Sequence, residues 1–116
     1  MKVTFKSSLD ARRTASGWEL LGVLAATIDE RDVYVPAGFV TDFASVPRLP
    51  FAFWLFGDSA HRAGVLHDWL YSQGEPRRWC DAVFLAAMQA EGLLAWRRYP
   101  MWLAVRLFGA RAWGRR

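Results

Sequence analysis

The chain has 116 residues, which suits one compact domain and is too short for two domains with separate cores. Hydrophobic residues make up 53% and charged residues 22% of it, a balance that excludes an intrinsically disordered protein. Lysine and arginine outnumber aspartate and glutamate by 15 to 11, so the net charge of +4 favours anionic partners. The single cysteine, Cys80, excludes an intramolecular disulfide framework and an all-cysteine zinc site.

The sequence contains no segment expected to cross a membrane. The opening MKVTFKSSLD lacks the basic and then apolar pattern of a secretory signal, so we expect a protein made in the cytoplasm and not exported by the classical route. The longest uncharged apolar runs, 49–57 and 99–105, are shorter than the roughly 20 residues of a membrane-spanning helix. We therefore expect a protein that is not integral to a membrane.

Strand patterns come first along the chain. Val3 and Phe5 alternate with polar neighbours, and 18–28 is rich in apolar and β-branched residues. The polar turn 29–32 separates that stretch from the short apolar segment 33–35. These patterns predict a small N-terminal antiparallel sheet.

A long ordered loop is expected over 37–57. Prolines and a glycine interrupt regular structure before and within it, at Pro36, Gly38, Pro47 and Pro50. Loops of this length commonly carry function.

Three helices are expected after the loop. The first is capped by Asp58 or Ser59 and runs to about Gln73, with Gly74 as its C-cap. The second opens at 75–76 and reaches Gly92, and the third runs from about Tyr99 to Ala112 with Pro100 setting its start. Short connections make the first two antiparallel. The sequence thus predicts an α+β fold that forms a single domain over 1–116.

The string LHDWLY (66–71) on the first helix carries the candidate chemistry. His67 and Asp68 point about 100° apart and can border one cleft, and Tyr71 lies one turn after His67. Asp81 on the second helix is spaced to lie opposite His67. A carboxylate there would hold the imidazole in one tautomer and increase its basicity, as a general base requires.

Oxygen ligands for a metal ion come from the loop and the first helix. Asp42, Asp68 and loop carbonyls are hard donors that suit calcium or magnesium. A cation beside a histidine base would form a hydrolytic pair, in which the histidine activates water and the cation polarises an ester carbonyl or phosphoryl oxygen. A two-histidine zinc site is not expected, because His61 and His67 are six residues apart and lie off a common helix face. The structural alternative is that the aspartates form a buried polar network that ties the loop to the helices.

Several motifs resemble a family of phage and prophage proteins catalogued as domain of unknown function 1353 (DUF1353). They are VPAGFVTDFASVPR (35–48), LHDWLY (66–71), Arg78 with DAVF (81–84) and Met88, and the segment 99–109 with Arg106. The resemblance implies a phage or prophage setting, with synthesis in a bacterial host, and no particular chemistry.

The chain also resembles the small bacterial and fungal secretory phospholipases of the A(2) class. His67, Asp68 and Tyr71 on one helix, with Asp81 and Phe84 on an antiparallel helix, follow their order. The resemblance implies that His67 activates water and that Asp81 orients His67. It also implies a calcium ion held by Asp42, the Phe43 carbonyl and Asp68, which would stabilise the oxyanion.

Two functions remain open. One is a structural or host-interaction module of a phage, associated with the virion, with a buried His/Asp network and other phage proteins as partners. The other is a calcium-dependent, phospholipase-like ester hydrolase acting at a phospholipid membrane surface, which the aromatic content of 16% would suit. Nucleic-acid binding is a less favoured alternative. It would use the basic C-terminal segment, where six arginines and no acidic residue follow Glu91.

Overall fold

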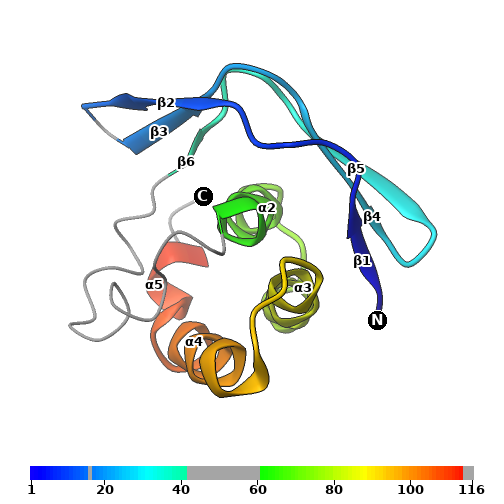
Figure 1. Ribbon diagram of the computed structural model, residues 1–116. Coiled ribbons are helices and arrows are strands. Elements are labelled where there is room, and N and C mark those ends of the chain that lie inside the picture. Colours follow the sequence, from blue (N-terminus) through cyan, green and yellow to red (C-terminus); the bar gives the residue numbers. More distant parts are fainter. Residues whose placement is uncertain (16, 42–60, 114–116) are drawn as a thin grey trace.

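The computed structural model describes residues 1–15, 17–41 and 61–113. Strands form the N-terminal part and helices the C-terminal part, which is the α+β fold predicted from the sequence. Figure 1 shows the strands arching over one side of the helices, with α2 and α3 nearest to them and α4 farther away.

The first sheet is antiparallel and contains β1 (Val3–Phe5), β4 (Leu24–Ile28) and β5 (Arg31–Val35) in the order β1-β4-β5. Alternate residues of β4 are buried, as expected for a strand with one face on the core. Asp29, in the turn between β4 and β5, adopts a φ of 54°, a left-handed conformation that aspartate tolerates better than most residues.

A second antiparallel sheet contains β2 (Ala11–Thr14), β3 (Gly17–Leu20) and β6 (Val40–Thr41) in the order β2-β3-β6. The prediction of one sheet was therefore wrong in this detail. The apolar stretch 18–28 contributes to both sheets, because the chain leaves β3 after Leu20 and enters β4 at Leu24. Strand β6 lies within the segment expected to be a loop, and the remainder of that loop, 42–57, lies outside the described residues.

The helices are α2 (His61–Ser72), α3 (Arg77–Ala90), α4 (Ala95–Phe108) and the short α5 (Ala110–Trp113). Gly74 has a φ of 77° between α2 and α3, the left-handed geometry expected of it. The expected caps Asp58 and Ser59 lie outside the described residues.

The third predicted helix has different boundaries. It begins at Ala95, so Pro100 lies inside α4 and not at its start, and it ends at Phe108 before the separate turn of α5. Pro100 removes one backbone hydrogen bond but is exposed near the beginning of the helix, where water can satisfy the freed carbonyl.

Glu91 joins the helices at the end remote from Gly74. It is the C-cap residue of α3, and its side chain accepts a 2.8 Å hydrogen bond from the Ala63 amide in the first turn of α2. A carboxylate suits this position because the first amides of a helix lack partners within the helix. The pairing helps to fix α2, which carries the candidate site, against α3.

One hydrophobic core cluster includes residues of both the strands and the helices. Strand residues such as Leu24 and Val35 share it with Leu66, Phe84 and Met101 of the three long helices. In the described ranges, no helix is both long enough and apolar enough to span a membrane.

Candidate active site

The His67 side chain lies against Asp81 across the α2–α3 interface. Its Nε2 atom is 2.7 Å from Asp81 Oδ1, so the structure contains the juxtaposition expected from the sequence. Asp81 is fully buried and His67 is 7% exposed. Because an ionised carboxylate only accepts hydrogen bonds, Nε2 donates this bond, and Nδ1 is the acceptor nitrogen in the neutral form of the ring.

Tyr71 completes this part of the site from one turn along α2. Its hydroxyl donates a 2.6 Å hydrogen bond to the same Asp81 oxygen. The Tyr71 and Phe84 rings also pack on the imidazole, with ring centroids 4.1 and 4.8 Å from that of His67. These contacts restrict both the position and the tilt of the His67 ring.

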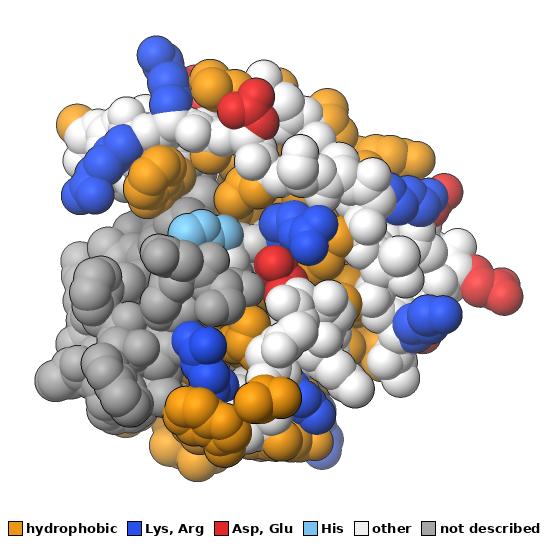
Figure 2. Space-filling view, viewed as in Figure 1, with side chains coloured by type: hydrophobic (Ala, Val, Ile, Leu, Met, Phe, Trp, Pro, Cys, Tyr) orange, Lys and Arg blue, Asp and Glu red, His pale blue; other side chains and the backbone are white. Residues whose placement is uncertain are grey.

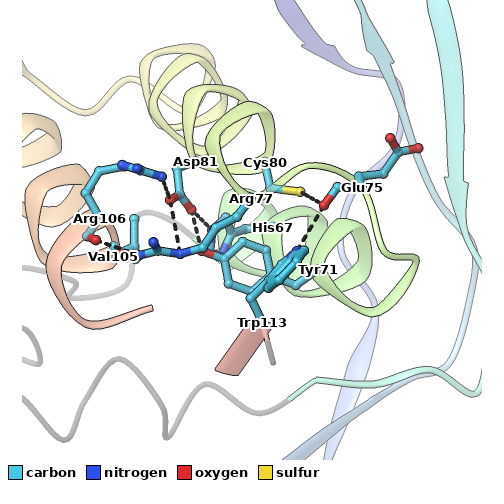
Figure 3. A network of polar contacts seen from close by, with 9 residues as sticks. All are labelled: His67, Tyr71, Glu75, Arg77, Cys80, Asp81, Val105, Arg106 and Trp113. Atoms are coloured by element: carbon cyan, nitrogen blue, oxygen red, sulfur yellow. Dashed lines mark hydrogen bonds and ion pairs between the residues drawn. The ribbon is translucent and has the colours of Figure 1, made fainter. Parts of the chain in front are cut away.

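Two arginines that the sequence analysis did not assign to the site flank the other Asp81 oxygen. Arg106 of α4 donates a 2.7 Å hydrogen bond to Oδ2, and the Arg77 Nε atom lies 3.9 Å from it. Arg77 also donates to the carbonyls of Val105 and Arg106 in the last turn of α4. Figure 3 shows Asp81 enclosed by side chains from α2, α3 and α4.

The surroundings of Asp81 determine its ionisation. Burial by itself would raise the pKa of the Asp81 carboxyl, but hydrogen bonds from His67, Tyr71 and Arg106 outweigh it and hold the pKa below its usual value. Burial, together with the hydrogen bond to Asp81 and the negative charge there, raises the pKa of Tyr71 well above its usual value. Asp81 is therefore ionised and Tyr71 is protonated at neutral pH.

The second ring nitrogen of His67 has a different environment. Among the described residues, Arg77 Nε is the one buried side-chain polar atom without a hydrogen-bond partner. His67 Nδ1 is not among such atoms, and it makes no hydrogen bond in the described part of the chain. One imidazole nitrogen is thus oriented by a carboxylate, which is the arrangement that a general base requires of its orienting partner.

Asp68, next to His67 on α2, belongs to a separate contact. The Thr41 hydroxyl of β6 donates a 2.6 Å hydrogen bond to Asp68 Oδ2. The other two predicted metal ligands, Asp42 and Phe43, lie outside the described residues. Within the described ranges, no group of three or more His, Cys, Asp or Glu residues could hold a metal ion.

The turn between α2 and α3 is attached to the end of the described chain. The Glu75 carbonyl accepts hydrogen bonds from Trp113 Nε1 at 3.0 Å and from the Cys80 thiol at 3.6 Å (Figure 3). Gly109, between α4 and α5, is so close to Tyr71 that a Cβ atom there would lie 2.9 Å from the tyrosine hydroxyl oxygen. The chain after α4 therefore packs directly on the candidate site.

A scan against family models matches residues 18–105 to the family described as "Protein of unknown function (DUF1353)". The chain belongs to this family. A search of curated proteins and a search of solved structures found no match. The DUF1353 match includes His67, Tyr71 and Asp81, together with the Thr41–Asp68 contact, and it ends one residue before Arg106. The family description names no activity, so the function of this DUF1353 member has to be inferred from its side chains.

Proposed function

We propose that this chain is an ester hydrolase in which His67 is the general base. The observation that carries the proposal is the His67–Asp81 pair, in which Nε2 lies 2.7 Å from a buried carboxylate oxygen and Nδ1 makes no hydrogen bond among the described residues. A histidine that is only structural commonly satisfies both nitrogens within the protein. An imidazole with one oriented and one available nitrogen is suited to removing a proton from water.

In the proposed reaction, His67 Nδ1 takes a proton from a water molecule while the water oxygen bonds to the ester carbonyl carbon. The carbonyl becomes a tetrahedral oxyanion, which re-forms the carbonyl as the bond to the leaving alkoxide breaks. The proton passes from His67 to the alkoxide, so the products are a carboxylic acid and an alcohol. Asp81 stays ionised and stabilises the transient imidazolium, while Tyr71 and Arg106 hold the Asp81 carboxylate in place.

Phospholipid esters are the substrate class that we propose. Large apolar side chains are exposed on α4, and the same helix provides Arg106 to the site. The similarity of the His67, Asp68, Tyr71 and Asp81 order to phospholipases of the A(2) class points to the same substrate class. This proposal places the enzyme at a phospholipid membrane surface.

Calcium is the proposed cofactor, with Asp68 as its described ligand. The Asp68 carboxylate is a hard oxygen donor, and its partner Thr41 directly precedes Asp42 in the sequence. With Asp42 and the Phe43 carbonyl as further ligands, a bound calcium ion would supply positive charge for the oxyanion. Calorimetric titration should detect calcium binding that Asp68→Asn removes, whereas Asp32→Asn, at an exposed carboxylate, should leave it intact.

The hydrolase proposal is tested by fatty acid release from phospholipid vesicles with calcium present. We expect release by the wild type, loss of at least 100-fold in His67→Ala, and a smaller loss in Asp81→Asn. His61→Ala is the matched control, because His61 is an exposed histidine of the same helix. A folded wild-type protein that releases no fatty acid, or a His67→Ala variant with full activity, would contradict the proposal.

A structural or host-interaction module of a phage is the second candidate. It is favoured by the complete burial of Asp81 and by the hydrogen bonds that link it to side chains of α2 and α4, which would hold a non-enzymatic scaffold equally well. This candidate expects His67→Ala to lower stability without any catalytic effect. The phage or prophage setting, synthesis in a bacterial host and association with virions remain proposals. Detection of the chain in purified virions of an induced lysogen would test them.

A further inference from the structure

Helix α4 presents a large apolar surface away from the core. Met101 and Val105 of this helix are buried, whereas another set of its residues is exposed by 49–64%. Residues at positions 96, 99, 103 and 107 share one helix face by their spacing. We call this set the α4 stripe; it consists of Trp96, Tyr99, Leu103 and Leu107. Leu94 and Phe108, which are also exposed, lie just before and at the end of the helix.

Positive charge accompanies the α4 stripe. The Arg97 guanidinium carbon lies 6.0 Å from the Trp96 ring centroid, and that of Arg98 lies 5.4 Å from the Tyr99 ring centroid. Arg98 also donates a 2.9 Å hydrogen bond to the Leu93 carbonyl. Six arginines and no acidic residue follow Glu91, so this part of the sequence carries a net positive charge. Figure 2 shows hydrophobic side chains with basic ones among them at the lower edge of the molecule, where Figure 1 places α4.

We propose that the α4 stripe docks on the surface of an anionic phospholipid bilayer. Trp96 and Tyr99 are of the types that settle at headgroup level, and Leu103 and Leu107 would enter the boundary of the acyl chains. The positive charges of Arg97 and Arg98 would add electrostatic attraction to the anionic headgroups. This inference rests on the proposed function, because a lipid hydrolase must reach a bilayer. Binding to vesicles is nevertheless measured separately from ester hydrolysis.

The residue types of the α4 stripe and of its neighbouring arginines together favour a bilayer as the partner. A wholly apolar patch would suit a second copy of the chain or another protein. Here aromatic, aliphatic and cationic residues occur together on a segment of net positive charge, which matches the layered chemistry of an anionic bilayer surface. Arg106 of the same helix contacts Asp81, so docking through α4 would bring the candidate site close to the lipid.

Co-sedimentation with vesicles tests the inference. We expect the wild-type chain to bind phosphatidylglycerol vesicles, to bind phosphatidylcholine vesicles at least tenfold more weakly, and to release as salt is raised. Leu103→Ser should weaken binding to the anionic vesicles. Leu21→Ser is the matched control, because Leu21 is 51% and Leu103 49% exposed and Leu21 lies between two strands.

Charge variants give a second matched pair. Arg97→Gln should weaken binding about fivefold, the effect expected for one arginine near an anionic surface. Arg13→Gln should leave binding unchanged, although Arg13 also lies 6.0 Å from a tryptophan ring, that of Trp18. Circular dichroism melting checks that all four variants fold, and quenching of Trp96 by brominated lipids, absent in Trp96→Phe, reports insertion independently.

Four outcomes would overturn the inference. They are no binding to anionic vesicles, equal loss in Leu103→Ser and Leu21→Ser, equal loss in the two arginine variants, or a dimer in solution that Leu103→Ser dissociates. The His67→Ala variant separates this inference from the hydrolase proposal. It should bind vesicles as the wild type does even if it releases no fatty acid, and wild-type binding without hydrolysis would overturn only the hydrolase proposal.

Discussion

The Tyr71 hydroxyl donates its hydrogen bond to Asp81 Oδ1, the same oxygen that lies 2.7 Å from His67 Nε2. The Tyr71→Phe substitution removes this hydroxyl, so the buried Asp81 carboxylate loses one hydrogen-bond donor. We expect the free energy of unfolding to fall by about 1–3 kcal/mol, as for other hydrogen bonds to buried charged groups. Urea denaturation measures the change. Tyr34→Phe, at an exposed tyrosine of β5, is the control and should change stability by less than about 0.5 kcal/mol.

The lowered pKa of Asp81 predicts a loss of stability in acid. Because the carboxyl has a lower pKa in the folded chain than in the unfolded chain, its contribution is present above the unfolded pKa and lost as the pH falls through the folded pKa. Urea denaturation between pH 7 and pH 3 should show this loss beginning below about pH 4 to 5. In Asp81→Asn the free energy of unfolding should be lower than in the wild type at pH 7, and it should change less as the pH falls.

Asp32 provides the control for that titration. Its pKa is also lowered, first by the hydrogen bond from Lys6, but both side chains are exposed. Salt screens such surface pairs, whereas the buried Asp81 is screened much less. An acid dependence that disappeared in high salt would contradict the assignment to Asp81.

Gly109→Ala should destabilise the chain. A Cβ at this position would overlap the Val105 carbonyl oxygen and press on the Tyr71 hydroxyl. We expect a loss of about 1–3 kcal/mol, typical of overpacking, measured by thermal or urea unfolding. Gly22→Ala is the matched control, since nothing lies within 4 Å of a Cβ built there. If the two variants were equally stable, the close approach of Gly109 to Tyr71 would be refuted.

Glu91→Ala should cost more stability than Glu75→Ala. Glu91 is held at the start of α2 by the Ala63 amide and Arg62, and its side chain is 10% exposed. Losing a helix cap with this burial should lower the free energy of unfolding by about 1–2 kcal/mol. The Glu75 carboxylate pairs with an exposed arginine, Arg31, and surface pairs of this kind contribute about 0–1 kcal/mol. Parallel urea denaturation of the two variants ranks these contributions.

The meeting of His67 and Asp81 could be predicted because it depends on local information. Gly74 ends one helix and Pro76 opens the next, so the connection is short and the two helices must run antiparallel. The spacing of 14 residues then places His67 and Asp81 near each other along the paired helices. These relationships need only helix periodicity and turn chemistry, both of which can be read from the residues.

Arg106, Arg77 and Thr41 were missed because their roles depend on tertiary packing. Nothing in the sequence determines how α4 is rotated against α3, so Arg106 looked like one arginine of a basic segment. The contact of Thr41 with Asp68 requires β6, a strand of two residues too short to show alternation. The second sheet was missed for a similar reason, because the sequence of β2, ARRT, has no apolar alternation.

The order in which the side chains around Asp81 are synthesised has a consequence for folding. A nascent chain makes His67, Tyr71 and Asp81 well before Arg106, the cationic donor that binds Asp81 Oδ2. Enclosing a carboxylate before its cation arrives is costly, so the α2–α3 hairpin by itself should keep Asp81 in contact with water. The helical half would then close only once α4 is available to supply Arg106, so the three long helices should assemble together and not as a pre-formed α2–α3 pair.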